Sequence, residues 1–507
     1  MVPRRTFIRL GLFFFISIGI FLACTRGLTR SSDTNDTGQI DFFSFPDDIS
    51  GLQDPDATPF RPQASPTPDQ PHNLPDLRTE TEIHIVQPGE SLFSIARVYS
   101  VTPEQIIAAN QLVNPDLLEV GRELLIPLPV PSTDGPSFKI IPDAGLVYGP
   151  GTETFDVAGF IEVVDGYLAR YSEEWGDRRL TGSEIVAEVA WNFSVNPRLL
   201  LALLDYQSGW LTRSNPEEID YPMGLYDPNR IGLYRQLSWA ADMLNRGYYL
   251  WRVNGTGAWI LPDGSLVPVD PTINAGTAAV QHFFAQLSGH DQWLRTVGER
   301  GFSESYWQLY GNPFADAFDP LIPADLVQPV FQLPFEAEAI WSFTGGPHGG
   351  WGDGSAWAAL DFAPPGEALG CIQSNAWVVA LADGWIVRTG EGQLLQDLDG
   401  DGFEQTGWVI FYLHLESRDR TAAGTFVHAG DRLGHPSCEG GISSGTHLHI
   451  ARKYNGEWIS ADQSELAFIM DGWTSTGSGN VYDGLLVKGS RTIAADVGRS
   501  DQNAISR

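Results

Sequence analysis

Apolar and polar positions repeat with two different periods along the chain. Within residues 154–309 apolar residues recur at helical spacing, and in residues 183–190 and 197–206 they fall on one helix face. Residues 377–381, 385–388 and 408–414 are short apolar runs in a glycine-rich context, which is typical of strands. The pattern predicts an all-helical middle domain, residues 138–334, followed by a β-rich domain, residues 335–471.

A smaller unit is expected at residues 81–130. Residues 83–87 favour a strand that turns into a helix through Tyr99, and Thr102 with Pro103 is a typical cap and first position for a second helix. Residues 121–127 favour a returning strand. The order is βααβ, so the chain as a whole is expected to be multidomain α+β.

The N-terminus has the pattern of an export signal. Arg4, Arg5 and Arg9 precede a charge-free run at residues 10–22, which leads into Ala23-Cys24. Thirteen residues rise only ~20 Å as a helix, short of the ~30 Å hydrocarbon slab, so a signal peptide at residues 1–24 is favoured over an uncleaved anchor. Residues 21–24 resemble a bacterial lipobox, which implies a lipid on Cys24 at the outer face of the cytoplasmic membrane. Twin-arginine and general secretory export both remain open.

Composition agrees with an exported multidomain protein. A length of 507 residues suggests roughly three folded units at ~150 residues each. Residues 25–80 are acidic and proline-rich and are expected to form a disordered linker, and residues 472–507 are expected to be a C-terminal tail. The formal net charge of −32 makes nucleic acid an unlikely partner.

Histidines mark the candidate chemistry. Six of the ten lie between His348 and His449. His447 and His449 stand two positions apart in a predicted strand, so both imidazoles project from one face. Catalytic zinc takes three protein ligands and keeps one position open, and His449 can supply one of the three.

The other ligands come from a resemblance. Gly345-Gly346-Pro347-His348, Leu360-Asp361-Phe362 and the H-x-H segment resemble the lysostaphin/LytM family of zinc endopeptidases, in its β-lytic/staphylolysin-like branch. The resemblance implies zinc bound by His348, Asp361 and His449, with His414 and His447 as catalytic residues. Twelve residues separate His348 from Asp361 and must loop out, and Asp353 within them remains a rival ligand.

Residues 81–130 resemble the LysM family. The segment beginning at Val86 follows the pattern V-x-P-G-E-S-L-x-x-I-A. The resemblance implies a groove near residues 89–93 and 110–114 that binds N-acetylglucosamine-containing glycan. The alternative is an intact small fold whose groove no longer binds glycan.

The middle domain carries only a weak resemblance, to the helix of lysozyme-like lytic transglycosylases. Gln207 stands where that family has its catalytic glutamate, and Asp205 points to another side of the helix. An amide cannot act as the general acid, so a non-catalytic domain is expected, whether structural or glycan-binding.

Two further features bear on ions and redox state. Asp397, Asp399 and Asp401 begin a calcium-loop pattern, but Trp408 occupies the twelfth position, so weak calcium binding and an acidic hairpin tip both remain open. Cys371 and Cys438 are the one candidate intrachain disulfide pair beyond Cys24, if their Cα atoms lie within ~7 Å.

The sequence therefore predicts an exported cell-envelope zinc metalloendopeptidase. Its substrate is expected to be the peptide of peptidoglycan, either stem or cross-bridge, with a LysM module on the glycan and a lipid or anchor in the membrane. Two alternatives are a catalytically inactive wall-binding protein or amidase activator on the same fold, and a secreted protease that acts on other proteins.

Overall fold

The computed structural model describes residues 72–75, 77–99, 101–112, 118–130, 135–315, 317–366 and 369–507, which belong to one unit of the chain, residues 45–507. The expected signal peptide, Cys24 and most of the linker lie outside the described residues. Within the part that is described, no helix is long and apolar enough to cross a membrane.

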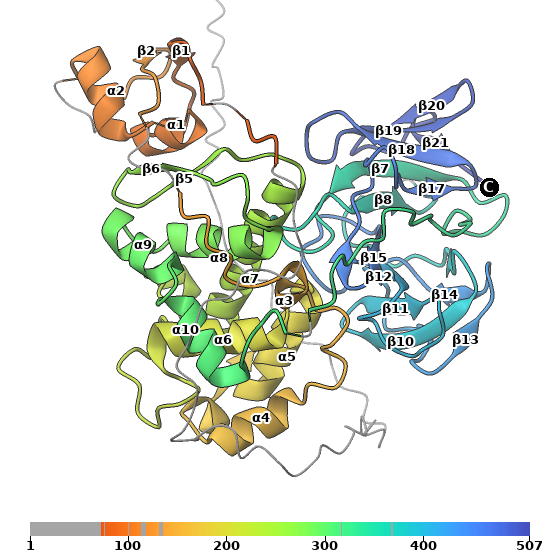
Figure 1. The fold of residues 1–507 in the computed structure, drawn as a ribbon. Helices are drawn as coiled ribbons and strands as arrows, with labels where there is room; N and C mark the ends of the chain where they lie inside the picture. The colour runs from red at the N-terminus through yellow and green to blue at the C-terminus, as the bar shows by residue number, and fades with distance from the viewer. Residues whose placement is uncertain are drawn as a thin grey trace, which may run out of the picture. The chain divides into compact units, whose positions relative to one another are not determined.

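The small N-terminal unit has the predicted βααβ order (Figure 1). Strand β1 (Glu82–Ile85) pairs antiparallel with β2 (Glu123–Ile126), and α1 (Leu92–Val98) and α2 (Pro103–Asn110) lie between them in the chain. Thr102 and Gln105 form a capping box that starts α2.

The middle domain is built mainly from helices. Thr181 and Glu184 form the capping box that begins α5, while Asn196 caps α6 and Pro197 occupies its first turn. The helices are α3 (Asp143–Leu146), α4 (Val157–Val164), α5 (Gly182–Phe193), α6 (Pro197–Ser208), α7 (Leu233–Arg252), α8 (Ala275–Ala285), α9 (His290–Val297) and α10 (Phe302–Tyr310), with short 3-10 helices at Leu168–Arg170 and Pro228–Arg230.

The expectation of an all-helical middle domain is wrong. It contains two hairpins, β3 (Ser172–Trp175) with β4 (Arg178–Thr181), and β5 (Ala258–Ile260) with β6 (Leu266–Pro268). The turns contain Gly176 and Gly264, both at positive φ. Strands of three or four residues are too short for a periodicity argument, and it is the turn chemistry that creates them.

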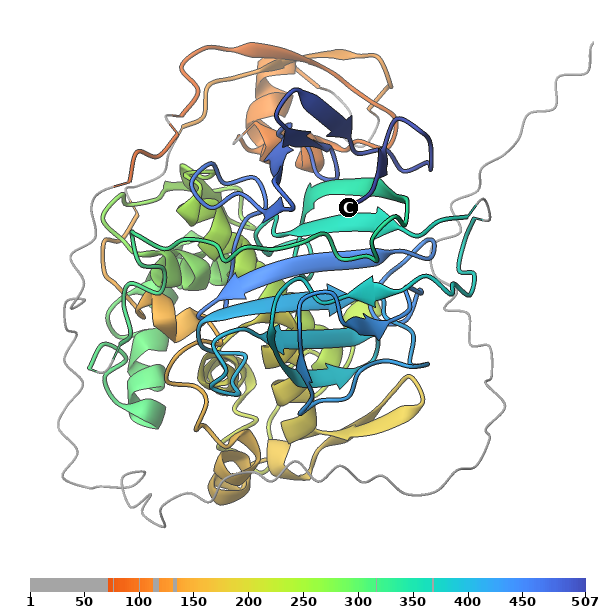
Figure 2. The same cartoon turned by 90° about the vertical axis from the view of Figure 1, so that its right-hand side faces the viewer.

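The C-terminal domain is an antiparallel sheet of nine strands, seen across its width in Figure 2. Its order is β13-β10-β11-β12-β15-β8-β7-β21, and β16 pairs with β15. The bounds are β7 (Trp341–His348), β8 (Ala359–Ala363), β10 (Gly384–Gly390), β11 (Gln393–Asp397), β12 (Trp408–Leu413), β13 (Phe426–Val427), β15 (Leu448–Tyr454), β16 (Glu457–Trp458) and β21 (Ala504–Ile505), with a separate pair β9 (Val378–Val379) and β14 (Arg432–Gly434).

Residues 472–507 are not a tail, so the expected domain end at 471 is also wrong. A second sheet contains β17 (Ile469–Met470), β18 (Trp473–Gly477), β19 (Gly484–Lys488) and β20 (Arg491–Ala494), and β21 pairs with β7. Trp473, Leu486, Ile493 and Ile505 are buried in the core of the C-terminal domain. Their widely spaced apolar positions lie in short strands within a Gly- and Ser-rich sequence, which hid them.

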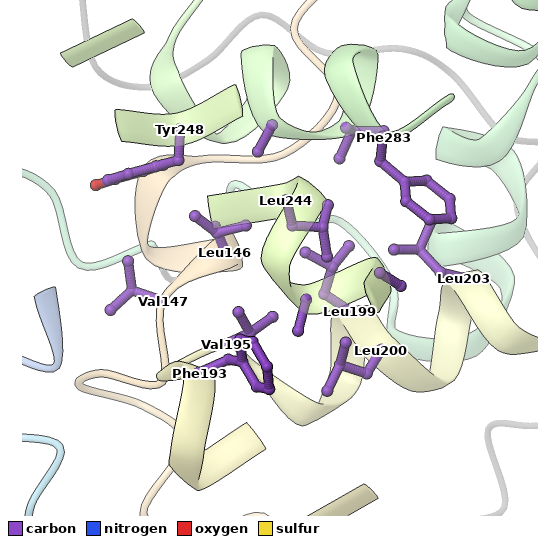
Figure 3. Close-up of a cluster of buried hydrophobic side chains, with 14 of the residues drawn as sticks. Leu146, Val147, Phe193, Val195, Leu199, Leu200, Leu203, Leu244, Tyr248 and Phe283 are labelled. Atoms are coloured by element: carbon purple, nitrogen blue, oxygen red, sulfur yellow. The ribbon is translucent and has the colours of Figure 1, made fainter. Parts of the chain in front are cut away.

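The middle domain and the sheet share one hydrophobic core. Val409 and Phe411 of β12 face the cluster formed by the middle-domain helices, whereas Ile410 and Tyr412 face the C-terminal domain's own core. Figure 3 shows the helical part of the shared cluster, with Leu199 of α6 near Leu244 of α7 and Leu203 of α6 beside Phe283 of α8. Burial on both faces explains why β12 is a continuous apolar run.

Candidate metal centre and active site

Three neighbouring strands bring the candidate ligands together. Asp361 of β8 lies directly opposite His449 of β15, and it also pairs with Gly345 of β7. His348 is the last residue of β7. Residues 101 positions apart in the chain thus meet at one end of the sheet.

The three ligand atoms are close and buried. His348 Nε2 lies 3.0 Å from His449 Nδ1, and Asp361 Oδ1 lies 3.3 Å from each of these nitrogens. Tetrahedral zinc with bonds of about 2.0–2.1 Å requires ligand atoms roughly 3.3 Å apart, so the spacing fits zinc. His348, Asp361 and His449 form one of two groups of such residues in the described chain whose atoms could hold a metal ion.

Backbone carbonyls fix the tautomers of the two imidazoles. His348 Nδ1 donates to the carbonyl of Gly346 at 2.8 Å, and His449 Nε2 donates to the carbonyl of Gly350 at 3.0 Å. When neutral, each ring therefore turns its unprotonated nitrogen toward Asp361. These carbonyls are the outer partners that orient metal-binding histidines, and no sequence motif had pointed to them.

The negative charge of the buried Asp361 is not balanced by a permanently charged side chain within the cluster of His348, Asp361 and His449. Among the described residues, no group donates a well-directed hydrogen bond to the buried Asp361 Oδ1. Burial would raise the pKa of Asp361, but the neighbouring imidazoles, above all His348, hold it well below its usual value. Burial would lower the pKa of His348, yet Asp361 raises it above 6.5, while burial lowers the pKa of His449. A proton on His348 or a divalent cation would balance the carboxylate.

The two predicted catalytic histidines lie beside this cluster. His447 Nδ1 donates to the carbonyl of Gly445 at 2.7 Å, and its Nε2 lies 3.8 Å from Asp361 Oδ1. The ring of His414 lies 4.4 Å from that of His447, and its Nδ1 donates to the carbonyl of Glu439 at 3.0 Å. Burial and the nearby His447 and His449 lower the pKa of His414 to about 3, so its ring is neutral near pH 7.

A disulfide joins the two loops beside these histidines. Cys371 and Cys438 are bonded, with Cα atoms 5.7 Å apart, which confirms the predicted pair. Cys438 directly precedes Glu439, whose carbonyl orients His414. On the other loop, Ile372 hydrogen-bonds to Thr446, the neighbour of His447.

Tyr482 is a site residue that the sequence did not reveal. It lies between β18 and β19, and its ring stacks on His348 at 4.3 Å. Burial, then Asp361 and Asp353, raises its pKa, so the hydroxyl stays protonated at neutral pH. Its strands belong to the segment that was expected to be a tail, and a lone aromatic residue in a Gly-rich loop offers no signal.

Other predicted residues lie apart from the cluster. Asp353, the rival ligand, is exposed on the loop between β7 and β8 and is not among the clustered ligands. Two further histidines of the domain also lie apart: His428 is exposed, and His435 is buried, where its Nδ1 donates to the carbonyl of Ala376 at 2.8 Å.

The calcium-like loop is closed by its own hydrogen bonds. Asp397 accepts from the amides of Asp399, Gly400 and Gly402, and Asp401 accepts from Phe403 and Thr406. Burial and Asp397 raise the pKa of Asp399 to about 6. Asp397, Asp399 and Asp401 form the second group whose carboxylates could hold a metal ion.

In the middle domain, the candidate polar residues have structural partners. Gln207 donates to the carbonyl of Met223 at 3.0 Å, and Asp205 accepts from the amide of Thr212 at 2.9 Å.

The chain is similar to several known proteins. The family described as LysM domain matches residues 84–127, and the family described as LasA, N-terminal domain matches residues 139–324. Protease LasA of Pseudomonas aeruginosa is 26% identical over 361 residues, covering 67% of this chain and 78% of the relative. Beta-lytic metalloendopeptidase of Lysobacter enzymogenes is 26% identical over 156 residues, or 30% of this chain and 83% of the relative. Among solved structures, the M23 metalloprotease pseudoalterin from the deep sea matches at 24% identity with a TM-score of 0.29, covering 36% of this chain and 100% of that one.

The relatives and the His-Asp-His cluster define the chain as a metalloendopeptidase. More particularly, the relatives support a LytM-like zinc peptidase, and residues 84–127 match the LysM domain family.

Proposed function

We propose that this enzyme is an exported, wall-bound peptidoglycan endopeptidase. Its parts are a signal peptide with lipobox (1–24), a linker (25–80), a LysM module (81–130), a non-catalytic middle domain starting near residue 138, and a peptidase domain from 335 that extends to the C-terminal strand β21. The observation that carries the proposal is the meeting of His348, Asp361 and His449 in a chain that also has a LysM domain.

In this proposal His348 Nε2, Asp361 Oδ1 and His449 Nδ1 hold zinc. Bound zinc supplies Lewis acidity, which lowers the pKa of water to about 7 and polarises a peptide carbonyl. His414 and His447 share two roles, either way round: one takes a proton from the attacking water and returns it to the leaving amine as the peptide bond breaks, and the other donates a hydrogen bond to the developing oxyanion. The carbonyls of Glu439 and Gly445 keep the other ring nitrogen of each histidine protonated.

The LysM match supports the cell wall as the substrate. A glycan-binding module near a peptidase raises the local concentration of wall peptide at the site. The test is hydrolysis of purified sacculi compared with an elastin-like protein. Soluble wall peptides should appear, chelation should stop their release, and zinc should restore it. Activity that persists in chelator with zinc absent would contradict the zinc mechanism, and cleavage of the elastin-like protein alone would favour a general protease.

The inactive alternative is tested in the same assay. An amidase activator or wall-binding protein would bind sacculi and release no peptide. The presence of all five site residues, His348, Asp361, His414, His447 and His449, speaks for an active enzyme.

Membrane attachment through Cys24 is a separate part of the proposal. Cys24→Ser should release the protein into the medium or leave its precursor uncleaved, because the thiol is the acceptor for the lipid. Mass spectrometry of the mature N-terminus decides this, and an unmodified Cys24 would contradict it.

Weak calcium binding by Asp397, Asp399 and Asp401 is the last part. Burial first, and then the neighbouring Asp397 carboxylate, raises the pKa of Asp399, and a bound cation would offset the crowding of these negative charges. Calorimetric titration with calcium, on wild type and Asp399→Asn, separates this proposal from a plain acidic hairpin tip, for which no heat of binding is expected in either protein.

A further inference from the structure

The loop between the two ligand strands β7 and β8 packs closely against the middle domain. The amide of Gly354 donates to Asp242 Oδ1 of α7 at 2.8 Å. A Cβ atom at Gly354 would lie 2.0 Å from the backbone carbonyl oxygen of Asp242, and one at Gly352 would lie 2.5 Å from its Oδ1. Glycine at both positions is therefore what allows the loop to approach this turn of α7.

The same loop reaches the metal site at its other end. The carbonyl of Gly350 accepts the hydrogen bond of His449 Nε2 at 3.0 Å. Bonds within the loop connect the two ends: the amide of Gly350 donates to Ala356 at 3.1 Å, and Ser355 Oγ accepts from the amide of Trp351 at 3.1 Å. Gly354, which contacts Asp242, is adjacent to Ser355, and Trp351, which donates to Ser355, is adjacent to Gly350. The contact with Asp242 is thus connected to the Gly350 carbonyl by a short path.

The middle domain also fixes the side of the loop that faces the sheet. A Cβ at Gly350 would lie 2.5 Å from the indole of Trp458, so this ring limits where Gly350 can move. Trp458 is itself held by two middle-domain groups, because its amide donates to the Tyr249 hydroxyl at 2.9 Å and its Nε1 to the carbonyl of Phe193 at 3.4 Å.

We propose that Asp242 is a positioning residue for the zinc site. It anchors the loop through Gly354, the loop places the Gly350 carbonyl, and that carbonyl holds the proton on His449 Nε2 so that Nδ1 is free to bind metal. The inference rests on the proposed role of His449 as a ligand. Loss of an outer partner of a metal-binding histidine usually costs 10–100-fold in metal affinity, and Asp242 stands one step further out.

The test is zinc affinity of the full chain, measured by competition with a chelator of known affinity. Asp242→Ala should weaken zinc binding about 10-fold. Asp242→Asn keeps an acceptor oxygen for the Gly354 amide and should stay within about 2-fold of wild type. Asp291→Ala removes a carboxylate whose side chain is 88% exposed on α9 and should change nothing.

Turnover on sacculi adds a second readout. At saturating zinc, Asp242→Ala should regain most of the wild-type rate, because the defect is in metal binding. Thermal unfolding of the metal-free proteins shows whether each variant folds, and Asp242→Ser replaces Asp242→Ala if the latter does not accumulate as folded protein.

The outcomes separate this inference from the proposed function. Unchanged zinc affinity in Asp242→Ala, or equal weakening in Asp242→Asn, overturns the role of Asp242 while the ligand set stands. Full zinc binding in His449→Ala overturns the ligand set itself.

Discussion

His447 and His449 project from the same strand face but have different surroundings. His449 Nδ1 lies within 3.3 Å of both other candidate ligand atoms, whereas His447 Nε2 comes no nearer to Asp361 Oδ1 than 3.8 Å. One histidine of the pair is therefore suited to hold metal and the other to face substrate.

Substitution separates these two roles. His449→Ala should lower bound zinc and turnover together, because it removes a third of the protein ligands. His447→Ala should keep its zinc but lose roughly 10²–10⁴ in turnover, the usual contribution of a positioned acid–base group. Metal analysis with an assay on sacculi checks both. Zinc lost from His447→Ala and retained in His449→Ala would mean that the roles are reversed.

Zinc binding should also depend on pH in a defined direction. Asp361 raises the pKa of His348 above 6.5 in the metal-free chain, and a protonated imidazole cannot bind metal. Apparent zinc affinity should therefore be complete above this raised pKa and fall as the pH decreases through it. Chelator competition between pH 5 and 9 measures the effect. An affinity that stays constant down to pH 5 would contradict the coupling between His348 and Asp361.

At the scale of elements, loops beside the sheet orient the catalytic groups that the strands bring together. The strands place His348, Asp361 and His449, but the residue that orients His414 follows Cys438 in a loop. The disulfide to Cys371, 67 positions away, restrains this loop.

Replacing both cysteines should affect stability and rate. The double variant Cys371→Ser with Cys438→Ser should lose about 2–4 kcal/mol in free energy of unfolding, because the unfolded chain regains the entropy of an open loop. Turnover should fall while bound zinc is retained, since the three ligands lie on strands. Denaturant unfolding and metal analysis test this, and loss of zinc in the folded variant would show that the disulfide also supports the ligand strands.

At the scale of the whole molecule, the middle and peptidase domains form one folding unit. Their side chains share a core, and Glu457 of β16 accepts from the Tyr248 hydroxyl at 3.1 Å and pairs with Arg252 at 3.1 Å. Domains with separate cores unfold separately, whereas a shared core couples them.

The two domains should accordingly unfold in one transition. Leu203→Ala in α6, where the side chain is fully buried, should cost about 2–5 kcal/mol and lower the temperatures of helix loss and zinc release together. Val163→Ala, at a side chain that is 50% exposed, is the matched control. Circular dichroism and a zinc-sensitive dye follow the two events. Helix loss well below the temperature of zinc release would show that the domains are independent.

The sequence by itself determined the elements and residues that depend on interactions between near neighbours along the chain. Capping residues and apolar periodicity predicted the βααβ unit and helices α5 and α6, and the family motifs predicted His348, Asp361, His414, His447 and His449, which the fold brings to one place. Asp361 was recognisable in the segment Leu360-Asp361-Phe362 and His449 in the H-x-H segment, because each lies inside a short apolar strand.

Tertiary structure decided what depends on contacts between distant segments. Tyr482 reaches His348 only because β18 and β19 pack beside β7, and Ile505 completes the main sheet by pairing with Trp341. The carbonyls of Gly346 and Gly350 carry no side-chain signal, yet they set the histidine tautomers. The contact between Asp242 and Gly354 joins residues 112 positions apart. No pattern along a sequence reports such a contact, because its geometry depends on how two domains share one core.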